Sequence, residues 1–310
     1  MLSSKASILA GLLVASAATG QQGLMTPRQF QEIPSRAADA VSRYGSDPNQ
    51  YGELRLPAGS GPHPVVVLVH GGCFKAAYAT LRDLAPIGDA LKREGIATWN
   101  IEYRRLGQPG GGWPGTYQDV GAAIDHLRGL ARRDRLDLRR IVFVGHSAGG
   151  HLALWAAARA RVPSTSAIAG RRPLRPLGAI DLAGPFDMRE NIANYHGECR
   201  DPVITQMMGG EPDRVPDHYR AASPGALLPL QVPHVLIWGE HESFMPRPLA
   251  ERYVERARAA GDDAVLRIVS GAGHFEIASP LTPAWPVLLA EIKRLLEAPA
   301  SDGRSSSSRR

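Results

Sequence analysis

The sequence lacks long apolar runs, internal repeats and a cysteine near its N-terminus. Its longest N-terminal apolar stretch, Ala6 to Val14, is shorter than the roughly 20 residues that a bilayer-spanning helix needs. The first cysteine, Cys73, lies far from this stretch, so nothing suggests a lipid-attached N-terminus. These scarcities argue against a membrane anchor and against a repeat protein.

Lysine is scarce, and the arginine-rich stretch of the chain has no aromatic residues beside it. The net charge is +6, and arginines over residues 132–140 are interleaved with Asp134 and Asp137. Nucleic-acid surfaces combine basic patches with stacking aromatic groups, so we expect no nucleic-acid partner. The glycines at 110–112 follow no strand and precede no Lys-Ser/Thr pair, as a phosphate loop would. We expect neither a cofactor nor a metal.

The two ends of the chain differ from its middle. Lys5 precedes the apolar stretch, and the small residues Ala15 to Ala17 follow it, which is the order of a secretory signal peptide over residues 1–18. Cleavage would leave a periplasmic or secreted protein without a stable membrane anchor. Residues 298–310 are rich in Ser and Arg without apolar periodicity, which predicts a disordered tail. A single domain over residues 28–297 remains.

Short β-branched runs alternate with segments of helical period through this domain, and 44% of the chain is hydrophobic. That alternation predicts an α/β fold with a mostly parallel central sheet flanked by helices. The predicted strands are 51–56, 65–70, 96–103, 141–145, 178–182, 235–239 and 265–269. The predicted helices are 81–94, 117–130, 149–161, 249–260 and 286–296.

One connection, residues 189–224, is too long for an ordinary link between two strands. Such a length indicates a functional loop or a small inserted subdomain, and we interpret it as a short lid-like insertion. Its Tyr195, Met207 and Met208 either line an acyl or aryl pocket or only pack the insertion onto the domain.

A Gly-x-Ser-x-Gly pentapeptide spans Gly145 to Gly149 and is centred on Ser147. The pentapeptide alone is weak, but an apolar strand precedes it and a helical segment follows it. A sharp strand-to-helix turn lifts a serine above the sheet edge, and glycines on both sides tolerate the close approach. This context predicts that Ser147 is a catalytic nucleophile.

A second glycine-rich segment, His70–Phe74, directly follows another apolar strand. Acyl transfer builds an oxyanion that needs preorganised N–H donors, and glycine lets the backbone approach closely. We assign the donors to Gly72, Cys73 and Ala148, the residue after the nucleophile. His70 is interpreted as a structural brace of the loop.

A serine nucleophile needs a histidine base, and that base needs a carboxylate to orient it. His274 follows the last predicted strand, which is the place for the base in a chain order of Ser, acid, His. The loop after residues 235–239 offers both Glu240 and Glu242, and Asp187 ends the preceding strand region. The residues alone leave these three acids open.

These motifs resemble the α/β-hydrolase superfamily, and more narrowly its bacterial esterase/lipase and kynurenine-formamidase-like branch. The resemblance rests on His70–Phe74, Gly145–Gly150, Trp238–Pro246 and Gly271–Phe275. It implies an α/β-hydrolase fold and places the acid at Glu242, with Glu instead of the commoner Asp. Trp238 and Phe74 depart from the pattern and weaken a formamidase assignment.

The two cysteines, Cys73 and Cys199, fall beside the predicted oxyanion loop and in the insertion. In an exported protein they either form a disulfide that ties the insertion to the site or remain two independent thiols.

The sequence as a whole predicts a metal-independent serine hydrolase that cleaves small-molecule carboxylic esters through an acyl-enzyme. The alternatives are an amide hydrolase, either arylformamidase-like or a peptidase, and a noncatalytic binding protein with the same fold.

Overall fold

The computed structural model describes residues 23–200 and 202–297, so the predicted signal peptide (1–18) and tail (298–310) lie outside the described residues. Eight strands form one sheet in the order β1-β2-β4-β3-β5-β6-β7-β8. Strand β2 is antiparallel to β1 and β4, and every other pairing is parallel. The strands are β1 Ala40–Arg43, β2 Tyr51–Arg55, β3 His63–Val69, β4 Ala97–Ile101, β5 Leu136–His146, β6 Gly178–Leu182, β7 His234–Gly239 and β8 Ala264–Val269.

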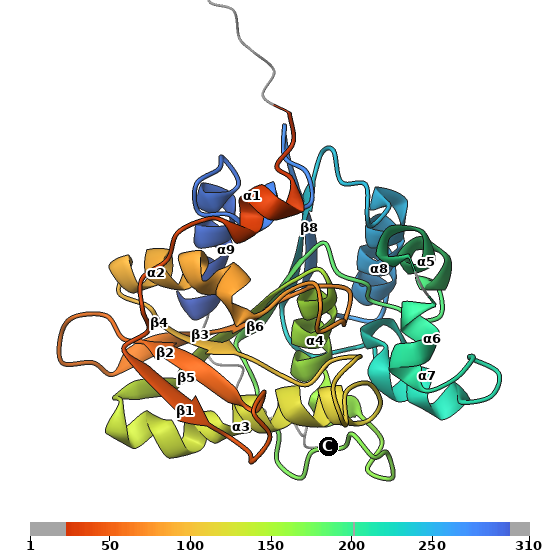
Figure 1. Cartoon of the computed structure of the whole chain (residues 1–310), viewed down its shortest axis with the longest axis horizontal. Helices are drawn as coiled ribbons and strands as arrows, with labels where there is room; N and C mark the ends of the chain where they lie inside the picture. Colours follow the sequence, from red (N-terminus) through yellow and green to blue (C-terminus); the bar gives the residue numbers. More distant parts are fainter. Residues whose placement is uncertain (1–22, 201, 298–310) are drawn as a thin grey trace, which may run out of the picture.

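Helices cover both faces of this sheet (Figure 1). On one face lie α2 (Ala85–Arg93) and α9 (Trp285–Glu297), and on the other α3 (Gly115–Arg133) and α4 (Ala148–Ala157). Helix α8 (Arg247–Ala259) packs on the edge strand β8. Strands β4, β6 and β7 are buried along their whole length, as expected for parallel strands covered on both faces.

The predicted α/β-hydrolase architecture is confirmed, with differences at element ends. Strand β5 begins at Leu136, five residues before the predicted start, because its first half is partly exposed and lacks the apolar signal. The predicted helix 81–94 is a 3₁₀ turn, Leu81–Leu84, followed by α2, and the predicted helix 149–161 ends at Ala157 before another 3₁₀ turn, Arg159–Arg161. Strand β1 was not predicted, since its side chains only alternate between partly buried and exposed.

The insertion, residues 189–224, contains three short helices: α5 Ile192–Cys199, α6 Val203–Met208 and α7 Pro216–Ala222. They lie beside α8 at one end of the molecule (Figure 1). At the N-terminal end of the described chain, the five-residue helix α1 (Pro27–Gln31) begins at a capping box formed by Thr26 and Gln29. Over the described ranges, no helix combines the length and apolar character needed to cross a bilayer.

Candidate active site

The carboxyl ends of the parallel strands meet at one edge of the sheet, and the predicted site residues follow those ends. Ser147 comes directly after β5, the His70–Phe74 loop after β3, Glu242 after β7 and His274 after β8. This edge is where ligands bind in open α/β sheets. The topology therefore brings together four segments that are far apart in the sequence.

Ser147 occupies a strained turn between β5 and α4. Its backbone is left-handed, with φ 54° and ψ −124°, and its N–H donates to the carbonyl of Leu182 on β6 (2.8 Å). The flanking glycines are required by space: a Cβ on Gly145 would lie 1.9 Å from the Gly149 carbonyl oxygen, and one on Gly149 would lie 2.0 Å from that of Val69. The turn presents Ser147 to a cavity, although only 8% of the residue is exposed.

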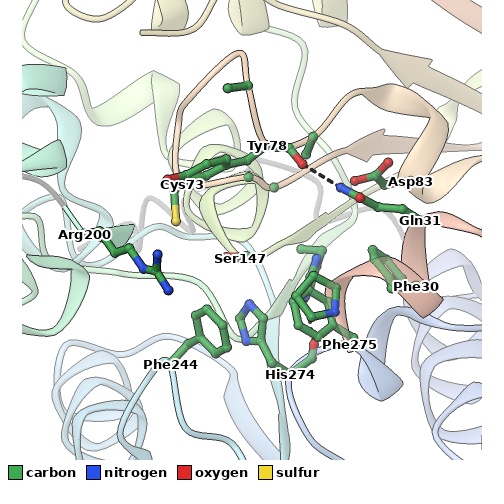
Figure 2. A pocket seen from close by; sticks show the side chains of 16 residues that line it. Phe30, Gln31, Cys73, Tyr78, Asp83, Ser147, Arg200, Phe244, His274 and Phe275 are labelled. Carbon is green, nitrogen blue, oxygen red and sulfur yellow. Dashed lines mark hydrogen bonds between the residues drawn. The ribbon is translucent and has the colours of Figure 1, made fainter. Parts of the chain in front are cut away.

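Glu242 and His274 form a buried pair. The Nδ1 atom of His274 lies 2.9 Å from Glu242 Oε2, and the two side chains are 4% and 1% exposed. The other carboxylate oxygen accepts the backbone N–H groups of Phe244 (2.7 Å) and Met245 (3.1 Å). The carboxylate is thereby fixed, and it fixes the imidazole with Nδ1 as donor. No hydrogen bond joins the Ser147 hydroxyl to His274, although both line one cavity (Figure 2).

The two other candidate acids point elsewhere. Glu240 accepts hydrogen bonds from the Ser270 hydroxyl (2.7 Å) and the Gly271 N–H (2.8 Å), which lower the pKa of its exposed carboxyl. Asp187 accepts the N–H groups of Arg189 and Glu190 at a turn before α5. Of the three acids, only Glu242 contacts His274.

The 70–74 loop has an unusual backbone beside the serine turn. Gly72, Cys73 and Phe74 are consecutively left-handed, with φ of 96°, 52° and 56°. A Cβ on Gly71 would lie 2.9 Å from the Cβ of Ser147, so the loop and the turn are in direct contact. In the described chain, the N–H groups of Gly72, Cys73 and Ala148 make no hydrogen bond to protein. Three backbone donors therefore remain available next to Ser147.

The side chain of His70 supports the 70–74 loop, which agrees with the structural role predicted for it. Its ring is fully buried and contacts the Gly71 carbonyl (3.0 Å) and Glu102 Oε1 (2.9 Å). Glu102 is buried, yet its pKa is lowered, because His70 and Arg105 outweigh the effect of burial. The Tyr103 hydroxyl donates to the His70 carbonyl (2.7 Å), and the ring of Tyr103 stacks on the imidazole of His70. The loop thus rests on a buried, charged network.

Two residues that contact His274 were not identified from the sequence. The Nε2 atom of His146 donates to the His274 carbonyl (2.9 Å), and burial together with the neighbouring His274 holds the pKa of His146 well below its ordinary value. The ring of Phe244 stacks on the imidazole of His274 at 4.2 Å. His146 lies within the Gly-x-Ser-x-Gly motif, but nothing in that motif says what its variable residue contacts.

Ser147 and His274 open onto a cavity of about 450 Å³ (Figure 2). Aromatic side chains form much of its wall, and Phe30 and Gln31 of α1 close one side. Phe30 packs on both His146 and Phe275, with ring centroids 5.5 Å apart in each case. The role of α1 was not predicted, because a five-residue helix gives almost no periodic signal. The lining residues are Pro27, Phe30, Gln31, Gly71, Gly72, Cys73, Ala77, Tyr78, Ala79, Asp83, His146, Ser147, Arg200, Phe244, His274 and Phe275.

The insertion reaches the cavity through Arg200, which lies in the left-handed region at the end of α5. A disulfide between Cys73 and Cys199 joins α5 to the 70–74 loop, so of the two alternatives that the sequence left open, the disulfide is the one found. Met207 and Met208 are fully buried and do not line the cavity, which agrees with the interpretation that they pack the insertion. Tyr195 is buried as well and does not line the cavity. No cluster of three potential metal ligands occurs among the described residues.

The fold is similar to solved structures of bacterial esterases. Esterase B from Lactobacillus rhamnosis is 19% identical, with a TM-score of 0.71 over 86% of this chain and 88% of that one. A propionate-bound thermophilic esterase, Est2 of Thermogutta terrifontis, is 20% identical, with a TM-score of 0.66 over 83% and 93%. A bifunctional GH43-CE protein of Bacteroides eggerthii is 23% identical, with a TM-score of 0.69 over 84% of this chain, which spans 38% of the length of that protein. No curated protein matches the sequence.

The fold and the polar groups at its carboxyl edge define the class of serine carboxylic ester hydrolases with an α/β-hydrolase fold. Residues 53–253 match the model of one family within that class. The chain belongs to the BD-FAE family of α/β-hydrolase-type esterase domains. The narrower kynurenine-formamidase-like branch stays a prediction.

Proposed function

We propose that the chain cleaves carboxylic esters of small molecules through an acyl-enzyme, with Ser147 as nucleophile, His274 as base and Glu242 as the orienting acid. The observation that carries the proposal is the buried Glu242–His274 pair, which opens onto the same cavity as Ser147. An imidazole with Nδ1 bonded to a carboxylate presents its Nε2 as the proton acceptor. That is the tautomer a serine nucleophile requires.

Acylation begins when Ser147 Oγ attacks the ester carbonyl carbon while His274 Nε2 takes the hydroxyl proton. The carbonyl oxygen becomes an oxyanion, to which the N–H groups of Gly72, Cys73 and Ala148 donate. Collapse of the intermediate breaks the ester C–O bond, and His274 gives its proton to the leaving alkoxide. The alcohol departs, and the acyl group remains on Ser147.

Deacylation repeats the sequence with water. His274 takes a proton from the water as its oxygen attacks the acyl carbon, and the same three N–H groups hold the second oxyanion. Collapse breaks the bond to Ser147 Oγ, which recovers the proton from His274, and the carboxylic acid leaves. Glu242 stays ionised throughout and stabilises the imidazolium that forms twice in each cycle.

Two of the similar solved structures carry phosphorus inhibitors. Esterase B is described with a tributyrin phosphonate inhibitor, and the Thermogutta enzyme as phosphoramylated by tabun. Activated nucleophiles attack phosphorus electrophiles of this kind, which supports the same chemistry here. Together with the predicted signal peptide, the disulfide supports a periplasmic or secreted location, because disulfides persist in oxidising compartments.

The test is pre-steady-state hydrolysis of p-nitrophenyl acetate and butyrate. We expect a burst of p-nitrophenol in the wild-type protein and none in Ser147→Ala. The exposed Ser270 contacts Glu240 rather than the cavity, so Ser270→Ala is the matched control and should retain the burst. A fluorophosphonate probe should label the wild type and Ser270→Ala but not Ser147→Ala. Undiminished turnover in Ser147→Ala would overturn the proposal.

The identity of the substrate is tested by measuring hydrolysis rates over a panel of compounds. Esters of graded acyl length would measure how much of the cavity an acyl chain fills. Feruloyl esters and N-formylkynurenine in the same panel separate an ester hydrolase from an amide hydrolase. We expect ester cleavage to exceed formamide cleavage, since the contacts described above contain nothing specific for an amide leaving group.

A further inference from the structure

Tyr195 carries a buried hydroxyl that makes no well-formed hydrogen bond to any described residue, although the Ser147 side chain is its polar neighbour. The residue lies on α5 within the insertion and is 3% exposed, and its Oη makes no hydrogen bond of normal geometry. Leaving a buried polar group without a well-formed hydrogen bond is unfavourable, and such groups are rare in folded proteins. An unpaired hydroxyl next to an active site therefore calls for a partner that arrives during the reaction.

Two contacts hold Tyr195 beside the 70–74 loop. Its ring lies 6.0 Å from the ring of Phe74, measured between centroids. Cys199 follows four residues later on the same face of α5 and is bonded to Cys73. Phe74 in turn contacts the ring of His151 on α4, the helix that begins just after Ser147. The helix that carries the hydroxyl thus contacts two consecutive residues of the 70–74 loop, Cys73 through the disulfide and Phe74 through the ring contact.

The charges around the phenol keep it protonated. Burial raises its pKa most, and the carboxyls of Asp181 and Glu242 raise it further. The side chain of Ser147 is a polar neighbour whose hydrogen-bonding interaction opposes this rise only in part. A phenol in such a setting is a donor of a hydrogen bond and does not serve as an anionic base.

We propose that the Tyr195 hydroxyl is a fourth donor of the active site, which hydrogen-bonds the reacting oxygen atoms when the tetrahedral intermediate forms at Ser147. This inference rests on the proposed function. The three backbone N–H groups come from the 70–74 loop and the serine turn, whereas this donor comes from the insertion. Because the hydroxyl lacks a well-formed hydrogen bond beforehand and gains one in the transition state, the interaction raises kcat rather than ground-state affinity.

The direct test is Tyr195→Phe, which keeps the ring and its contact with Phe74 but removes the hydroxyl. With p-nitrophenyl acetate we expect kcat to fall about 10- to 100-fold while KM changes less than about twofold. Tyr219→Phe is the matched control, because Tyr219 is also a buried tyrosine of the insertion but its hydroxyl donates to the Gly210 carbonyl (3.0 Å). That control should keep its kcat.

A second measurement separates a catalytic hydroxyl from one that only packs. Phenylboronic acid forms a tetrahedral adduct with a reactive serine, so Tyr195→Phe should weaken its inhibition by about the same factor as kcat. The melting temperature should stay level or rise, since the variant removes an unpaired buried group. An unchanged kcat overturns the inference, as does a fall in melting temperature without a loss of boronate affinity.

The two proposals fail in different ways. If Ser147 is not the nucleophile, either the wild type shows no burst and no fluorophosphonate labelling, or Ser147→Ala keeps both. If only the Tyr195 inference is wrong, the wild type reacts with both reagents, Ser147→Ala does not, and Tyr195→Phe behaves like the wild type.

Discussion

The two sides of Ser147 are built differently. On the side of the sheet edge, Glu242 is held by three hydrogen bonds and His70 by two, all between buried or nearly buried groups. On the side of the insertion, the Tyr195 hydroxyl is unpaired, and Arg200 faces the cavity without an ion pair to any described residue. The sheet side is preorganised for the chemistry, whereas the insertion side keeps groups available for what enters the cavity.

The largest expected effect lies on the sheet side. Glu242→Gln should lower kcat for p-nitrophenyl butyrate by about 10²- to 10⁴-fold, because an amide no longer fixes the tautomer of His274 or stabilises its charged form. Glu240→Gln is the matched control from the same loop and should remain close to wild type. Steady-state kinetics of both variants test the assignment. Loss of activity in Glu240→Gln alone would reverse it.

The next effect concerns the covalent tie between the two sides. Cys199→Ala removes a disulfide that joins residues 126 positions apart, which should lower the free energy of unfolding by about 2–5 kcal/mol. Thermal melts with and without dithiothreitol measure the loss. Reductant should destabilise the wild type and leave Cys199→Ala unaffected. Equal melting temperatures for oxidised wild type and variant would show that the bond adds nothing to stability.

Asp181 is an exception to the well-satisfied sheet side. It is the last residue but one of β6, is fully buried and has one unpaired carboxyl oxygen, and burial raises its pKa from 3.8 to about 8. Between pH 4 and 8 the Asp181 carboxyl is ionised in the unfolded chain but protonated in the folded protein. The free energy of unfolding therefore falls as the pH rises, by at most about 1.4 kcal/mol per pH unit.

Asp181→Asn cannot lose that proton, so its advantage in unfolding free energy over the wild type should grow from pH 5 to pH 8. Urea unfolding at both pH values measures this difference. The exposed Asp217 provides a matched Asp→Asn control. A difference that shrinks with rising pH would contradict the assigned protonation state.

The smallest effect belongs to Arg200, on the insertion side. An arginine that lines the cavity and has no ion pair to a described side chain should favour esters that carry a second, free carboxylate. Arg200→Met should lower kcat/KM for p-nitrophenyl hemisuccinate about 3- to 10-fold while that for the uncharged p-nitrophenyl butyrate stays level, and added salt should reduce the gap. Equal losses on both esters would place Arg200 in packing rather than recognition.

The sheet side was largely predictable from sequence, because its residues follow strong local patterns. Buried strands read as apolar runs, and the turn around Ser147 needs glycine at fixed positions. The acid that orients His274 was harder to predict, since Glu240 and Glu242 lie in the same loop. What separates them is the pair of N–H groups from Phe244 and Met245 that hold only Glu242, and such loop geometry leaves no periodic signal.

The cavity walls could not be predicted in the same way. Phe30 reaches the site from a helix of five residues, and His146 contacts His274 across 128 positions of sequence. The three helices of the insertion are short and carry little periodicity. Their positions depend on tertiary packing and on the disulfide. Both override the weak local preference of these segments for a secondary structure.

The disulfide also distinguishes two groups of residues around the cavity. Ser147, His274 and Glu242 follow the strands β5, β8 and β7, and none of them lies in the insertion that the bond attaches. Tyr195 and Arg200, in contrast, belong to a segment that the bond fastens to the 70–74 loop. Reduction would therefore release the insertion from the 70–74 loop, while the hydrogen bonds that hold Glu242 and His274 contain no cysteine.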